Sequence, residues 1–188
     1  MLDGVKHETW IMVLSNRLYA SRNLPARCIN ALQVMLPRPP LRSFTVTLST
    51  AGDNFKVDVS MPVVITVLNT GSIPGGFAVD RPHTEYILFH FSLTMNGNMV
   101  PKTSFHRAIR GEAGATDPEV GLGGSADYVT LAPGKSVQYT VDLKKLYAIA
   151  PPGTYTFSVE LPSDDNNPIP VFSQPIQLKI VPSQQPSK

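Results

Sequence analysis

Residues 131–143, LAPGKSVQYTVDL, and residues 152–159, PGTYTFSV, decide the fold class of this chain. In both stretches apolar and polar side chains alternate with period two, which predicts β-strands with one buried side and one solvent-facing side. A Pro-Gly pair stands before each alternating run, and such pairs are typical of tight turns. The two stretches therefore predict short strands that are joined by turns.

Three glycines and one tyrosine have predicted structural roles in these turns and strands. Gly97 follows Asn96, and an Asn-Gly pair supplies the positive φ angles of a type I′ hairpin turn. Gly134 is expected in the turn before the first quoted strand, and Gly153 permits a sharp entry into the second. Tyr155 is expected to bury its ring while its hydroxyl bonds back to the preceding backbone.

The same alternation continues over most of the chain. The segment 63–68 is almost wholly apolar and is predicted to be a central strand that is covered on both sides. Asp142 is expected to cap a short helical turn that ends at Tyr147. Glycine-rich and proline-rich composition predicts loops at 72–82 and 104–125, the second of them mobile. Strands are predicted at 44–49, 55–61, 63–68, 85–95, 98–103, 128–131, 137–143, 155–161 and 176–180.

These elements define the fold class. No amphipathic helix of ten residues separates the strands, which excludes a parallel sheet built from βαβ units. We predict that residues 43–182 form an all-β domain, an immunoglobulin-like antiparallel β-sandwich of eight or nine strands. Residues 1–42 are predicted to be a basic arm and proline linker, poorly ordered or partly helical, with helical spacing at 10–18 and 26–35. Residues 183–188 are predicted to be a flexible tail.

The positive charge of the chain is concentrated in the arm. Residues 1–42 hold six basic and two acidic residues, whereas the remainder holds ten basic and twelve acidic residues. The predicted sandwich is therefore mildly acidic and offers no basic surface for nucleic acid. The single cysteine, Cys28, lies in the arm, which excludes a disulfide within the sandwich. No apolar run approaches the eighteen residues of a membrane span.

The first residues of the chain do not decide in which cellular compartment the protein is found. Residues 10–14 are apolar for only five positions, fewer than the apolar core of a signal peptide needs. Five arginines and no acid occur between 9 and 42, which is similar to a transit peptide; a mis-assigned start codon is the alternative. We expect an extracytoplasmic protein if the true start carries a signal peptide, and a cytoplasmic one otherwise.

The quoted stretches, with Leu146 and Tyr147 between them, resemble the last strands of bacterial immunoglobulin-like or fibronectin-type-III-like modules. In those modules a Leu-x-Pro-Gly turn leads into a strand, and Pro-Gly-Thr-Tyr opens the penultimate strand after a short crossover. Residues 172–180 are similar to their closing strand. The same region is similar to the prodomain of deuterolysin-type metallopeptidases and to the intracellular proteinase-inhibitor family of bacilli. These resemblances imply a fold, and they assign no functional residue of those families to a position in this chain.

The sequence contains no motif for catalysis. It lacks the HExxH and GxSxG spacings, and the glycine-rich stretch 121–125 has no lysine at phosphate-loop spacing. His83 and Glu85 would share a face in an extended chain and could contribute to a zinc site. Asp164 and Asp165 could offer oxygen ligands to calcium. A solvated strand entry and a plain turn are the alternative interpretations, and we predict no metal and no cofactor.

Exposed strand residues are the remaining candidates for a binding site. Leu88 and His90 are predicted on the outward face of the strand 85–95, where an apolar patch would mark a partner surface. We predict a non-enzymatic module for protein interaction or structural support, from an exported bacterial protein. It is expected to be a monomer with an unknown protein partner. The alternatives are a proteinase inhibitor or prodomain-like regulator, and a metal-dependent or carbohydrate-binding activity.

Overall fold

The chain divides into two compact units, Met1–Leu41 and Arg42–Lys188. The computed structural model describes residues 12–14, 17–19, 43–52, 54–81, 83–121, 125–163 and 169–182. All the elements described below belong to the second unit, except for one pair of short strands.

That pair is formed by β1 (Met12–Leu14) and β2 (Arg17–Tyr19), which run antiparallel. The helical spacing predicted over 10–18 is therefore wrong for residues 12–14, 17 and 18. Two paired strands satisfy each other's backbone groups without a helical turn. The predicted helical stretch 26–35 and Cys28 lie outside the described residues.

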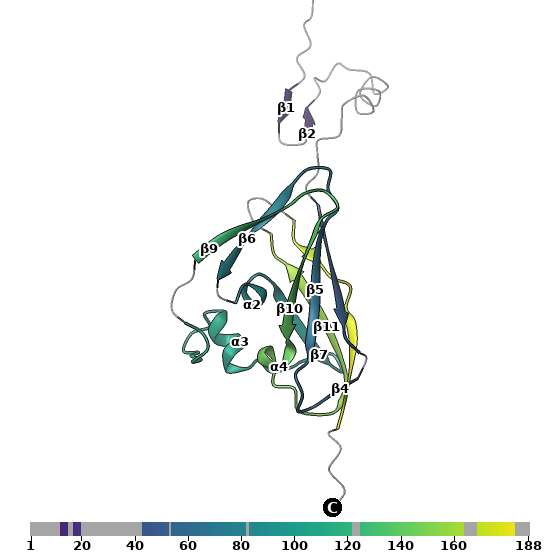
Figure 1. Ribbon diagram of the computed structural model, residues 1–188, viewed down its shortest axis with the longest axis vertical. Coiled ribbons are helices and arrows are strands. Elements are labelled where there is room, and N and C mark those ends of the chain that lie inside the picture. The colour runs from purple at the N-terminus through teal and green to yellow at the C-terminus, as the bar shows by residue number, and fades with distance from the viewer. Residues whose placement is uncertain are drawn as a thin grey trace, which may run out of the picture. The chain divides into compact units, whose positions relative to one another are not determined.

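The second unit has the predicted class, an all-β, immunoglobulin-like sandwich (Figure 1). Its three-stranded sheet has the order β10-β5-β3. In Figure 1, β10 and β5 of this sheet lie in front of β11 and β7, which belong to the six-stranded sheet. The six-stranded sheet has the order β4-β13-β11-β7-β8, with β12 paired to β11. The strands are β3 (Phe44–Thr50), β4 (Asn54–Lys56), β5 (Pro62–Asn69), β6 (Gly75–Arg81), β7 (His90–Met95), β8 (Asn98–Met99), β9 (Ser125–Leu131), β10 (Ser136–Asp142), β11 (Gly153–Leu161), β12 (Val171–Phe172) and β13 (Ile176–Val181).

The pairing is antiparallel for most of these strands, as predicted, and β13 pairs β4 in parallel. The core is formed by the inward side chains of both sheets. In β5 alternate residues are fully buried and the others are half-buried. Its central position between β10 and β3 is confirmed, but the predicted equal cover on both sides is wrong because only one side faces the core. Fully buried side chains include Val63, Ile65, Val67, Leu93, Phe157 and Leu161.

A two-stranded ribbon, β6 with β9, diverges from the three-stranded sheet at the links between β5 and β6 and between β9 and β10, which we call the corner (Figure 1). The predicted loop at 72–82 is therefore wrong for β6. Asn69 lies fully buried at the corner, where its Nδ2 donates to Ile73 O at 2.9 Å and to Leu131 O at 2.8 Å. Its Oδ1 accepts from Gly71 N at 2.8 Å. One side chain thus joins the two chain segments that turn there.

In the part of the chain that the structure describes, three short helices lie at the ends of the strands: α2 (Thr84–Ile87), α3 (Ser104–Ile109) and α4 (Leu143–Leu146). The predicted strand 85–95 is wrong for its first part, which is α2, and correct for β7. The predicted loop 104–125 is wrong over α3, which Thr103 caps by accepting from His106 N. The short helical turn predicted after Asp142 is confirmed as α4, and the Asp142 carboxylate accepts from Lys144 N.

The turn residues adopt the geometry that their types favour. Asn96 and Gly97 have φ of 52° and 79°, as a type I′ hairpin turn requires, and Gly134 has φ of 73°. Tyr155 is 1% exposed, and its hydroxyl donates to Pro151 O at 2.7 Å. The predicted hydrogen bond back to the preceding backbone is present.

Gly153 occupies the one position at the start of β11 where a side chain would collide. We expect Gly153→Ala to lower the free energy of unfolding by about 1–2 kcal/mol. An added Cβ would lie 2.6 Å from Met95 Cε, and φ is 158°. The loss stays moderate because a methionine side chain can move.

Urea unfolding of both proteins measures this difference. Gly52→Ala is the control, because nothing lies within 4 Å of a Cβ added at this position, and it should change stability by less than about 0.5 kcal/mol. Equal stability of Gly153→Ala and the natural chain would contradict the prediction.

Candidate functional site

The outward side chains of the six-stranded sheet form a continuous surface, which we call the outer face. Cross-strand register places its residues in rows, because paired positions point to the same side of a sheet. One row joins His90, Glu160 and Phe172, and the next joins Ser92 and Ser158. A further row contains Met99, Thr94, Thr156 and Gln177. The last row contains Thr154, Lys179 and Asn54. The outer face is thus rich in hydroxyl groups, and its charged side chains include Glu160 near one end of β11 and Lys179 near the other.

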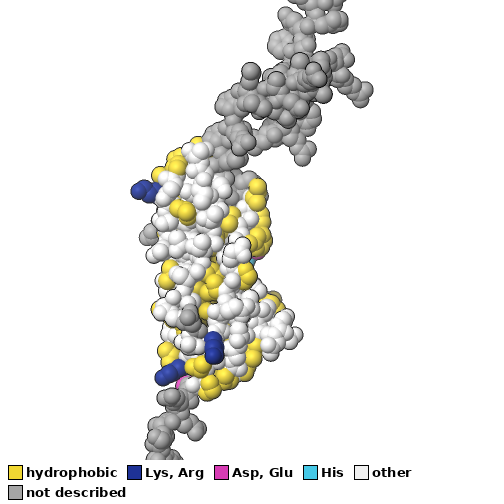
Figure 2. Space-filling model, turned by 90° about the vertical axis from the view of Figure 1, so that its right-hand side faces the viewer, with side chains coloured by type: hydrophobic (Ala, Val, Ile, Leu, Met, Phe, Trp, Pro, Cys, Tyr) yellow, Lys and Arg dark blue, Asp and Glu magenta, His cyan; other side chains and the backbone are white. Residues whose placement is uncertain are grey.

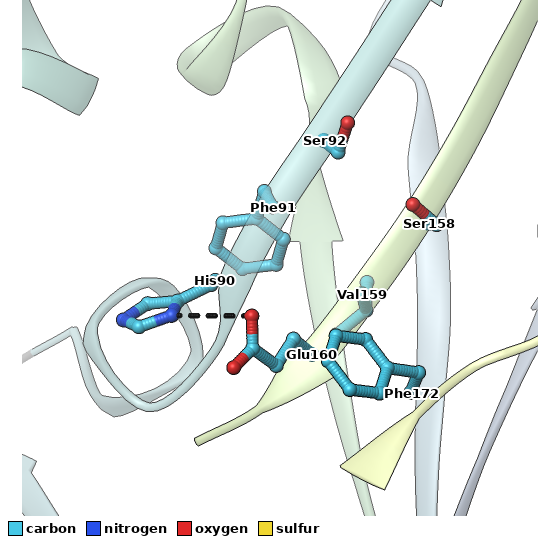
Figure 3. Close-up of a pocket in the computed structure, with 7 residues that line it drawn as sticks. All are labelled: His90, Phe91, Ser92, Ser158, Val159, Glu160 and Phe172. Carbon is cyan, nitrogen blue, oxygen red and sulfur yellow. Dashed lines mark ion pairs between the residues drawn. The ribbon is translucent and has the colours of Figure 1, made fainter. Parts of the chain in front are cut away.

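A shallow groove of about 140 Å³ lies in the outer face (Figure 3). Small side chains of β7 and β11 leave this hollow between larger neighbours. Glu160 lies between His90 and Phe172 in Figure 3, while the two serines continue the groove along the strands. We call it the β7–β11 groove; its lining is His90, Phe91, Ser92, Ser158, Val159, Glu160 and Phe172.

The groove combines one carboxylate, one imidazole and two hydroxyls. His90 Nδ1 lies 3.5 Å from Glu160 Oε2, and these side chains are 56% and 30% exposed. Ser92 Oγ donates to Met99 Sδ at 3.9 Å, a weak contact with a poor acceptor. Ser158 Oγ has no hydrogen-bond partner among the described residues. The groove therefore retains unused hydrogen-bonding groups.

Phe172 is the apolar wall of the groove. It is 65% exposed, although a phenylalanine side chain normally gains stability from burial. Figure 2 shows the side of the molecule that faces right in Figure 1, where hydrophobic side chains form several patches and lysine and arginine are few. An exposed aromatic ring beside a hollow is a feature of partner surfaces.

The predicted binding residues separate in the structure. His90 begins β7 and lines the groove. Leu88 is not on a strand; it follows α2, is half-buried and packs against the core. The predicted location of Leu88 on an outward strand face is therefore wrong, because the chain makes a helical turn before β7.

The structure describes two of the four predicted metal ligands, His83 and Glu85. His83 and Glu85 belong to the start of α2 and are not extended, so they do not share a strand face. His83 Nε2 lies 3.0 Å from Glu119 O, and its ring meets Phe105 edge-on. No group of three metal-ligating side chains occurs among the described residues. Asp164 and Asp165 lie outside those residues.

Sequence reasoning missed four groove residues with polar or exposed aromatic side chains as functional candidates: Ser92, Ser158, Glu160 and Phe172. Ser158 and Glu160 were predicted on the outward side of a strand, and the structure has them there. Their pairing with β7 and β12 could not be predicted, because it depends on strand register between distant segments. For Phe172 the sequence indicated only its position before the closing strand, and nothing in it predicted a binding role.

A second polar cluster lies in the interior beside α3. His106 is 2% exposed, and its Nδ1 lies 3.0 Å from Leu146 O. Arg110 Nη1 donates to Ile87 O at 3.0 Å, which ties the end of α3 to α2. Burial lowers the pKa of His106 to about 4, with smaller contributions from nearby cations, and burial also lowers the pKa of Arg110. We interpret this enclosed cluster as structural.

Comparisons with known proteins identify no family. No family model matches the chain, and no curated protein matches it. Among the described residues, no helix is both long and apolar enough to cross a membrane.

Several solved structures are similar to the chain at low identity. The CARDB domain of the PF1109 protein from Pyrococcus furiosus, in complex with di-metal ions, is 13% identical with a TM-score of 0.39; the match covers 78% of this chain and 100% of that one. A β-glucosidase from Listeria innocua in complex with glucose is 14% identical with a TM-score of 0.38, over 74% of this chain and 16% of that one. The β-glucosidase EmGH1 from Erythrobacter marinus has 13% identity, a TM-score of 0.39 and the same coverages. Similarities of this degree assign no function.

Proposed function

We propose that residues 43–182 form a non-enzymatic module that binds another protein through the outer face. The observation that carries this proposal is the β7–β11 groove with the exposed ring of Phe172 at its side. Interface centres are enriched in aromatic side chains and depleted in charged ones. The part of the outer face around the groove has this composition, since its lining includes Phe172, two serines and no lysine or arginine.

The shape of the face also favours a protein partner. The groove is far smaller than the roughly 300–1,000 Å³ of pockets that enclose small molecules. Its surroundings, however, continue as a strand surface to Met99 on one side and Gln177 on the other. Met99 is 60% exposed and adds a second apolar contact. A broad surface with one small hollow suits another protein better than a metabolite.

Photo-crosslinking tests this proposal. We expect p-benzoylphenylalanine at position 99 or at position 177 to give the same specific adduct in an extract of the source organism. Tyr128 is the control position, because it is 46% exposed but lies on β9, in another sheet. Mass spectrometry of the adduct identifies the partner.

Three outcomes would overturn the proposal. The first is no adduct from either position on the outer face, and the second is the same adducts from position 128. The third is an adduct of twice the mass of the chain, which would show self-association instead of binding to another protein.

We also propose that the module is of the fibronectin-type-III-like kind and belongs to an exported bacterial protein. The Leu-x-Pro-Gly and Pro-Gly-Thr-Tyr stretches support the first part. The proteinase-inhibitor alternative stays a prediction, which a panel of proteases at micromolar inhibitor would test.

A further inference from the structure

We propose that the β7–β11 groove is the site for the guanidinium group of an arginine side chain that a protein partner inserts. This inference rests on the proposed function, because it names the chemistry by which the outer face would recognise its partner. It follows from the volume, charge, aromatic wall and hydroxyl floor of the groove.

The volume of the groove selects a single side chain. About 140 Å³ admits the end of one long side chain but leaves most of a drug-sized ligand exposed. Binding energy at protein interfaces is concentrated in a few anchors that fill small pockets, and arginine is enriched among them. The groove has the size of such an anchor pocket.

The charge of the groove selects a cation. Its lining contains the Glu160 carboxylate and contains no lysine or arginine. His90 adds a positive charge only when it is protonated. With neutral His90 the groove carries one negative charge, which attracts a cation and repels carboxylates and phosphates.

The aromatic wall favours arginine over lysine. Phe172 is the Cα partner of Glu160, so its ring and the carboxylate are neighbours on the same side of the sheet. A planar guanidinium can stack on an aromatic face while its edge bonds to a carboxylate with two parallel hydrogen bonds. An ammonium group is a compact charge that cannot form this planar arrangement.

The hydroxyl floor accepts the remaining donors of a guanidinium. An arginine side chain carries five N–H donors, and a carboxylate uses two of them in a bidentate pair. Ser158 Oγ has no partner among the described residues, and Ser92 Oγ has only its contact with Met99. Both hydroxyls line the groove and have lone pairs to offer.

A titration of the full chain with small probes tests the inference. We expect N-acetyl-arginine amide to bind with a millimolar Kd and to shift the ¹⁵N–¹H signals of groove residues such as His90, Ser158 and Phe172. The citrulline analogue has the same shape without the charge and should bind at least 10-fold more weakly. The lysine analogue should bind at least 3-fold more weakly, because an ammonium group cannot stack on the ring of Phe172 while it forms two parallel hydrogen bonds with Glu160.

Variants locate the interaction. Glu160→Gln and Phe172→Leu are each expected to weaken binding of the arginine probe about 5- to 10-fold while the rest of the spectrum stays unchanged. Phe172→Leu keeps an apolar side chain and removes only the ring. Glu85→Gln is the matched control; it removes a carboxylate on α2, outside the groove, and should leave Kd unchanged.

The inference is overturned if the arginine probe shifts signals away from the groove, or shifts none. It is also overturned if the citrulline or lysine analogue binds equally well, or if Glu160→Gln leaves Kd unchanged. The proposed function has a separate readout: a partner that still crosslinks to positions 99 and 177 in the Glu160→Gln variant would support the function and contradict the arginine site. Loss of that adduct in Glu160→Gln, with retention in Glu85→Gln, supports both.

Discussion

Replacing Asn69 with leucine is expected to lower the free energy of unfolding by about 3–4 kcal/mol. The side chain is fully buried, and its Nδ2 donates to the carbonyls of Ile73 and Leu131 at 2.9 and 2.8 Å. Its Oδ1 accepts from Gly71 N at 2.8 Å. Leucine has a similar volume but none of these groups. The Leu131 carbonyl therefore loses a buried bond, and the partly buried Ile73 carbonyl and Gly71 amide lose their bonds to the side chain.

The effect should be concentrated at the corner between β5 and β6. The backbone of Asn69 also takes part in it, because Asn69 N donates to Lys135 O and Gly134 N donates to Asn69 O. These bonds remain in the variant, which should therefore still fold. We expect the Gly71 amide, which loses its side-chain acceptor, to exchange with deuterated solvent faster than in the natural chain.

Urea unfolding and hydrogen exchange measure these two effects. Asn98→Leu is the matched control, since Asn98 is exposed on β8 and the same chemical change there should alter stability by less than about 0.5 kcal/mol. A loss below about 1 kcal/mol for Asn69→Leu would show that the corner is held by its backbone bonds alone.

The second half of the sandwich could be predicted because its signals are local. From 131 to 161 the alternation, the Pro-Gly turns and the Asp142 cap each act within a few residues of one another. The structure has β10, α4 and β11 there, with Tyr155 bonded to Pro151 O. Local preference and tertiary packing agree in this part, so sequence reasoning found the correct elements.

The region before β7 could not be predicted, because tertiary contacts override its alternation. Ile87 and Phe89 follow the period of a strand, yet residues 84–87 form α2. Tyr86 is buried against Phe105, and its hydroxyl accepts from Asp142 N at 3.2 Å. A helical turn is needed to direct this ring inward, and only the folded neighbours create that demand.

The candidate site shows the same limit at longer range. Alternation alone predicted that Ser158 and Glu160 point outward. The groove, however, exists because Glu160 pairs with His90 on β7 and with Phe172 on β12. The register between β7 and β11, whose paired residues are about seventy positions apart, is not encoded in the composition of either strand. A single sequence therefore predicted the face but not the groove.

Acidification is expected to destabilise the protein through His106. Burial of this imidazole lowers its pKa to about 4 in the folded protein, from 6.5 in an unfolded chain, and the cations of Lys102 and Arg110 act in the same direction. Between pH 4 and pH 6.5, His106 is mostly protonated in the unfolded chain and mostly neutral in the folded protein. The contribution of neutral His106 is therefore complete above pH 6.5 and is lost as the pH falls toward 4. The full loss is about 3 kcal/mol, and about 2 kcal/mol of it falls between pH 6.5 and 5.

Urea unfolding at pH 7.5, 6.5 and 5 measures this loss, and His106→Phe separates it from the titration of carboxylates. The variant loses the bond to Leu146 O at every pH, so it should be less stable throughout but fall less steeply below pH 6.5. His90→Gln is the matched control, because it removes a histidine that is 56% exposed and lies on β7 outside the His106 cluster. A ¹H–¹³C titration of the folded protein gives the pKa directly. The rings of Phe91 and Tyr147 pack against the His106 imidazole and should disfavour its charged form. A measured pKa near 6.5 for His106 would contradict the prediction, because it would show that this packing has no such effect.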